Sequence, residues 1–201
     1  MSRALYSALE WVTRFAYIQL LWITFTIFGA VILGLFPATI AMFSVIRQWL
    51  KGQTDLPILN TFLKYYKEEF WKSNRIGFFI YCIAFIFLFN IFFLYTNIGE
   101  ILTWTSVPLI AGVFIFLLFL FYLFPTYVHF HIKGFQVLKY SFFTMLISPL
   151  QSFLIVVSLA SFYFLTYLLP ALFFIFGASF YAFITVHFAI QAFNKFDKQT
   201  T

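Results

Sequence analysis

Long uncharged segments alternate with short polar stretches along the whole chain. Residues 15–46, 76–99, 101–132 and 140–194 contain no Asp, Glu, Lys or Arg. A run of about 18 or more uncharged apolar residues is sufficient for a membrane-spanning helix. Stretches such as FLLFLFYLF at 116–124 are apolar on every side, whereas strands of a membrane β-barrel alternate apolar and polar positions. The pattern therefore predicts an all-α, polytopic integral membrane protein.

Prolines and polar links divide the uncharged segments into crossings. The stretch 140–169 would be about 45 Å long as one helix, against a hydrocarbon core of about 30 Å. Because proline interrupts a helix, we expect Pro149 to separate an interfacial helix at about 137–148 from a crossing. The prediction is one helical domain over 1–201. Its five crossings are expected at about 15–36, 76–97, 104–124, 149–169 and 170–192, with a cytoplasmic amphipathic helix at about 56–73.

The stretch GLFPAT at 34–39 marks the end of the first predicted crossing. Pro37 leaves the carbonyl of Leu33 without its helical donor, and we expect it to kink the helix there. The segment 37–50 has about 13 residues, which is shorter than the roughly 17–25 residues of a crossing. We therefore expect it to stay helical but to run along the inner surface of the membrane.

Small residues recur three and four positions apart around this proline. Such spacing places them on one helical face and lets two membrane helices approach closely. The alternative is that glycine and alanine are simply common in membrane helices. The predicted packing face consists of Ala30, Gly34, Pro37, Ala38 and Ala41.

The polar stretch 54–77 has the periodicity of an amphipathic helix. Asp55 can cap it, Pro57 suits its first turn, and Glu68 and Lys72 are spaced as a favourable pair. One interpretation is that its apolar stripe lies on the inner leaflet or against the protein's own helices. The other is that the stripe docks a cytoplasmic partner. The predicted contact residues are Phe62, Tyr66, Lys67, Phe70 and Trp71.

Composition supports the membrane class, and charge sets the predicted orientation. The chain is 64% apolar and 9% charged, against about 45–50% and about 25% in soluble domains. Its net charge of +6 comes from Lys and Arg beside the crossings, which favours positive-inside topology over nucleic-acid binding. Ten Lys and Arg fall on one side of the five predicted crossings, and Arg3 and Arg14 fall on the other. The N-terminus is therefore expected outside and the C-terminus in the cytoplasm.

Catalytic and metal-binding patterns are missing from the sequence. It has no HExxH, GxSxG, P-loop or glycine-rich nucleotide pattern, and Cys82 has no partner at a metal-ligand spacing. We therefore predict no enzyme activity, no cofactor and no metal. Polar residues inside crossings are either functional or hydrogen-bonding links between helices. Those identified here are Asn90, Gln151 and His187.

Two segments carry a recognisable set of residues. The first, 34–77, holds Gly34, Pro37-Ala38-Thr39, Arg47, Gly52, the Phe62–Lys67–Phe70 pattern and Ser73-Asn74, and the second is FPTYVHFHIKGFQVLKYSFFTMLISP at 124–149. Both resemble the YesL family of small bacterial integral membrane proteins, a family of unknown function. The resemblance implies a multi-pass protein of the bacterial plasma membrane. Such proteins are typically encoded beside carbohydrate ABC importers, which implies an accessory role in sugar uptake.

Two functions therefore stand as hypotheses. The first is a non-enzymatic accessory protein in the lipid bilayer that binds a carbohydrate ABC importer or a second copy of itself. The second is a small transporter or channel, which a polar cavity lined by Asn90, Gln151 and His187 would favour. An intramembrane enzyme ranks last because no catalytic constellation is present in the sequence.

Overall fold

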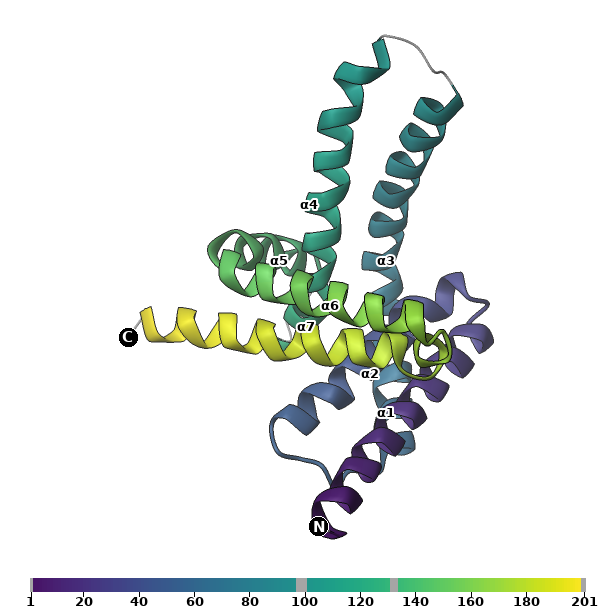
Figure 1. Ribbon diagram of the computed structural model, residues 1–201, viewed down its shortest axis with the longest axis vertical. Coiled ribbons are helices and arrows are strands. Elements are labelled where there is room, and N and C mark those ends of the chain that lie inside the picture. The colour runs from purple at the N-terminus through teal and green to yellow at the C-terminus, as the bar shows by residue number, and fades with distance from the viewer. Residues whose placement is uncertain (1, 97–100, 131–133, 200–201) are drawn as a thin grey trace.

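The computed structural model describes residues 2–96, 101–130 and 134–199, which form helices and links without any strand (Figure 1). The all-α prediction is therefore confirmed over these residues. Six of the helices are long and apolar enough to cross a membrane. The helices are α1 (Ser2–Phe28), α2 (Ile32–Leu50), α3 (Ile58–Thr96), α4 (Ile101–Phe130), α5 (Gln136–Ile147), α6 (Pro149–Leu168) and α7 (Ala171–Gln199).

Helix α2 lies at the centre of the structure. Helices α1, α3, α4 and α7 all pack against it, and most of its side chains are buried, with Phe43, Val45 and Ile46 fully so. Residues 37–50 stay helical, as predicted, and other helices of the protein cover most of their side chains. An apolar segment suits lipid and protein neighbours equally well, and here other helices cover it.

The first helix ends before GLFPAT rather than within it. Helix α1 stops at Phe28, and Ala30 and Val31 adopt left-handed backbone angles, with φ of 56° and 61°. Pro37 lies inside the continuous helix α2, so the boundary between the first two helices lies at residues 29–31 and not after Pro37. Left-handed angles are unfavourable for residues other than glycine, which means that contacts around the turn must hold it in place.

Glycines on both sides of the turn allow α1 and α2 to meet. A Cβ on Gly29 would lie 2.2 Å from the Cα of Gly34, and a Cβ on Gly34 would lie 2.4 Å from a carbonyl oxygen of α1. A larger residue at either position would collide with backbone. Ala38 and Ala41 are fully buried on α2, as the small-residue face predicts. Ala30 is exposed in the turn and does not belong to that face.

Helix α3 supplies a donor to the carbonyl that Pro37 frees. Because proline has no N–H, the carbonyl of Leu33 loses its helical donor. The side-chain amide of Asn74 donates to this carbonyl at 2.9 Å, and also to a carbonyl of its own helix. Nearby, the hydroxyl of Tyr81 donates to the carbonyl of Ile32 at 2.7 Å. These bonds fix the start of α2 against the middle of α3.

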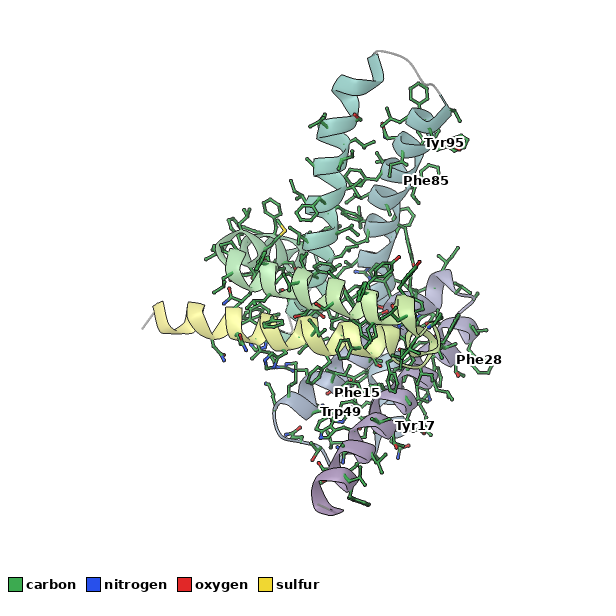
Figure 2. The ribbon with its side chains drawn as sticks, in the orientation of Figure 1. Phe15, Tyr17, Phe28, Trp49, Phe85 and Tyr95 are labelled. Carbon is green, nitrogen blue, oxygen red and sulfur yellow. The ribbon has the colours of Figure 1, made fainter. Side chains whose placement is uncertain are left out.

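Helix α3 is one helix of 39 residues, where the sequence predicted an amphipathic helix and a separate crossing. At 1.5 Å per residue it is about 58 Å long, nearly twice the hydrocarbon thickness. Its second half forms a hairpin with α4 that extends beyond the other helices (Figure 1). Rings such as Phe85 and Tyr95 are exposed on this hairpin (Figure 2). Helix α4 also continues through Pro125, beyond the predicted end at 124.

The last three helices are divided near the predicted prolines. Helix α6 begins at Pro149, directly after α5, and α7 begins just beyond Pro170. Helices α6 and α7 lie side by side. The side chain of buried Gln19 on α1 accepts a hydrogen bond from the backbone N–H of Ser179 on α7, at 2.9 Å. Helix α7, which extends past the predicted end at 192, therefore contacts both α1 and α2.

Replacing Asn74 with Ala is expected to destabilise the protein by about 0.5–1.5 kcal/mol, the net contribution of a typical hydrogen bond, because the carbonyl of Leu33 loses its donor. In a Pro37→Ala background the new N–H of residue 37 can bond to this carbonyl, so the same change should cost less. Thermal unfolding of the four proteins of this double-mutant cycle in detergent measures the difference. Equal losses in both backgrounds would contradict the assigned role of Asn74.

Candidate functional site

Residues 58–75 of α3 present three faces with different surroundings, and the first packs against α1. Phe62 is fully buried with its ring 5.5 Å from that of Phe25, and the hydroxyl of Tyr66 donates to the carbonyl of Phe25 at 3.1 Å. Phe70 adds an edge-on contact with the ring of Tyr66. Three of the five residues predicted to touch a partner are thus engaged within the chain. The apolar stripe lies against the protein's own helices, which was one of the two interpretations.

The second face of this segment points outward. Lys64 and Lys67 are exposed, and the side chain of Trp71 is 75% exposed. Lys67 and Trp71 are therefore the two predicted contact residues that remain available at the surface. They stand on a helix whose opposite side is fixed to α1.

The third face borders a cavity of about 510 Å³ between α2, α3 and the end of α4. Sites for small molecules typically measure about 300–1,000 Å³. Apolar side chains of all three helices complete its walls. The charged and hydroxyl-bearing residues that line it are Ser44, Arg47, Tyr65, Glu68, Glu69, Lys72, Arg75 and Tyr127.

Glu69 is held from two sides within the cavity. The ammonium of Lys72 lies 2.9 Å from one carboxylate oxygen, and the hydroxyl of Tyr127 donates to the other at 2.6 Å. The sequence predicted that Lys72 would pair with Glu68 instead. Tyr127 on α4 donates to Glu69 and not to Glu68. Its hydroxyl therefore favours the carboxylate of Glu69 as the partner of Lys72.

Arg47 is the cation on the α2 wall of the cavity. Its Nη2 donates to the carbonyl of His129 at 3.2 Å, and its Nε is buried without a hydrogen-bond partner among the described residues. The ion pairs within the described part of the chain do not include Arg47. Just beyond the helix, burial and then the charge of Arg47 lower the pKa of the Lys51 ammonium. The positive charges of Arg47 and Lys51 therefore lie near each other at this end of α2.

The sequence contained part of the signal for this cavity. Tyr65, Glu69 and Lys72 are spaced four and three residues apart, so they share one face of α3. This polar stripe could be recognised in the sequence beside the apolar stripe of Phe62, Tyr66 and Phe70. Arg47 and Tyr127 join it from distant helices, and no local pattern connects them to α3.

The three predicted intramembrane polar residues do not meet. Asn90 is exposed on α3, where its side chain donates to the carbonyl of Ile86. Gln151 is buried on α6. His187 is exposed on α7 with its Nε2 3.0 Å from the side-chain amide of Gln191. None of the three lines the cavity. Within the described residues, no group of three or more His, Cys, Asp or Glu is placed to hold a metal ion.

Comparison with known proteins places this arrangement in a family. Residues 15–91, which span the second half of α1, all of α2 and most of α3, match the family described as protein of unknown function, DUF624. The matched segment contains Leu33, Pro37 and Asn74. No solved structure matches the chain.

Three relatives from Bacillus subtilis (strain 168) are similar to this chain, and each is named as an uncharacterised protein. YesV is 33% identical over 201 residues, covering 98% of this chain and 94% of YesV. YesL is 31% identical over 194 residues, covering 94% and 89%. YteU is 39% identical over 132 residues, covering 66% of this chain and 59% of YteU.

Replacing Phe62 with Ala should destabilise the protein by about 3–5 kcal/mol, the range for large aromatic residues in cores. The matched change Trp71→Ala, on the outward face of the same helix, should alter the stability by less than about 0.5 kcal/mol. Thermal unfolding of both variants in the same detergent provides the comparison. Similar losses for the two would show that the assigned faces of α3 are incorrect.

Proposed function

The chain belongs to the DUF624 family of proteins of unknown function, and we propose that it is a non-enzymatic accessory protein that binds a membrane partner. The observation that carries this proposal is the outward face of α3 with Lys67 and Trp71. Tryptophan is enriched among the residues that dominate binding energy at interfaces. A side chain on a helix already fixed to α1 and α2 also has less conformational freedom to lose on binding.

The proposed partner is a subunit of a carbohydrate ABC importer. The resemblance to the YesL family supports this choice, because such proteins are typically encoded beside importers of this kind. Transport by the chain itself is less well supported. Asn90, Gln151 and His187, which would have to line a polar path, lie on separate helices and outside the cavity.

We further propose that the protein lies in the bacterial plasma membrane with both termini in the cytoplasm. The guanidinium of Arg14 donates to the carbonyl of Thr54 at 2.8 Å, and the rings of Phe15 and Trp49 are 5.9 Å apart (Figure 2). The N-terminal half of α1 therefore lies beside the link that follows α2, and not at the opposite end as an outside N-terminus requires. With the N-terminus on the same side as the link after α2, all twelve Lys and Arg fall on one side, in agreement with the positive-inside rule.

Single cysteines in a Cys82→Ser background test this orientation. With a membrane-impermeant maleimide and intact cells, a cysteine at Ser7 should be unreactive until the cells are permeabilised. A cysteine at Ala171, the first residue of α7 after the turn from α6, should react in intact cells. The proposed orientation fails if Ser7→Cys reacts from outside while the cells are intact.

Site-specific photo-cross-linking tests the partner. A photoreactive amino acid at Trp71 or Lys67 should form covalent adducts with an importer subunit in membranes of the native host. The control position is Phe85, which is exposed on the distant hairpin of α3 and α4. Adducts from Phe85 alone, or adducts of Trp71 with lipid only, would count against importer binding through this face.

A further inference from the structure

The cavity between α2, α3 and α4 has no part in the proposed partner contact, because Lys67 and Trp71 lie outside its wall. We propose that it is a binding site for a phosphate group, carried by a lipid headgroup or by a soluble phosphate ester. This inference goes beyond the proposed function and does not depend on it.

Two guanidinium groups of the cavity, those of Arg47 and Arg75, form no ion pair within the described residues. Its charged residues are three cations, Arg47, Lys72 and Arg75, and two carboxylates. The carboxylate of Glu69 already forms an ion pair with Lys72 and accepts a hydrogen bond from Tyr127. Arg47 and Arg75 belong to neither ion pair found within the described residues.

The surroundings of Arg47 favour the binding of an anion. Its Nη2 donates to the carbonyl of His129 at 3.2 Å, which restricts the orientation of the guanidinium. Its buried Nε has no hydrogen-bond partner among the described residues, and a buried donor without a partner is costly. Arg47 lines the cavity, and it can bind an oxyanion there because guanidinium groups match phosphate oxygens in both geometry and charge.

The position of Arg75 favours a phosphate at the level of the lipid headgroups. Arg75 is the last charged residue before the uncharged segment 76–99, and a charged residue at such a boundary lies near the headgroups. Trp71, one turn earlier, is exposed, as is typical of tryptophan at a membrane interface. Arg75 therefore faces the cavity at the depth where lipid phosphates lie.

The remaining volume requires more than a bare phosphate ion. A cavity of about 510 Å³ holds an organic group as well. Glu68 and Tyr65 also line it. Glu68 can accept hydrogen bonds from hydroxyl groups, and the hydroxyl of Tyr65, which accepts from the side-chain amide of Gln48, can still donate one. A phosphate attached to a hydroxyl-bearing group, as in phosphatidylglycerol, satisfies both sets of residues.

The test compares four purified full-length proteins in detergent: the parent chain, Arg47→Gln, Arg75→Gln and the control Lys64→Gln, which removes an exposed cation outside the cavity. Added phosphatidylglycerol and, separately, inorganic phosphate are titrated while the Tm is followed. Dioleoylglycerol and sodium chloride serve as the phosphate-free additives. Losing one charge-assisted contact should weaken the apparent affinity about tenfold or more.

We expect the parent chain and Lys64→Gln to be stabilised alike, and both cavity variants to lose the response. A response to phosphatidylglycerol alone identifies a lipid headgroup, and a response to inorganic phosphate identifies a soluble ligand. If Arg47→Gln fails to fold, the response of Arg75→Gln alone tests whether the cavity binds phosphate. The exposed side chain of Arg75 has no structural partner among the described residues, so this variant should fold. The proposal is overturned if neither additive stabilises the parent chain, or if Lys64→Gln loses the response as fully as Arg75→Gln.

Discussion

One backbone carbonyl, that of Leu33, sets much of this structure. Pro37 removes its helical donor, and a backbone carbonyl without a partner is unfavourable. Asn74 supplies the missing donor from α3. The proline is thereby tolerated inside a buried helix. The same bond fixes α2 and α3 relative to each other, both in depth and in rotation.

The rotation of α3 has consequences on all its sides. With Asn74 facing the start of α2, Phe62 and Tyr66 face α1 and fill the space beside Phe25. Glu69 then faces α4 and meets Tyr127, and Trp71 is left at the surface. A single helix thus serves as a core element, as a cavity wall and as an outward surface. The two proposed binding faces are separate because they lie on different sides of this helix.

The sequence was sufficient for the class of fold and for part of the packing. Uncharged runs predicted an all-α membrane protein, and the spacing of Gly34, Ala38 and Ala41 predicted close helix contact. The position of α2 could not be obtained in this way, because a uniformly apolar segment has no pattern that separates lipid-facing from protein-facing sides. The continuity of α3 was missed because its charged residues suggested a separate cytoplasmic helix. The cavity was missed because Arg47, Glu69 and Tyr127 meet only through tertiary packing.

The burial of α2 against α3 is the central claim, and intramolecular cross-linking tests it most directly. A Cβ at Gly77 would lie 2.7 Å from the ring of Phe36, so cysteines at these two positions should be close enough to couple. In a Cys82→Ser background, mild oxidation or a short bifunctional maleimide should join residues 36 and 77 within one chain in native membranes. Absence of this cross-link, when both single cysteines are reactive in unfolded protein, would contradict the placement of α2.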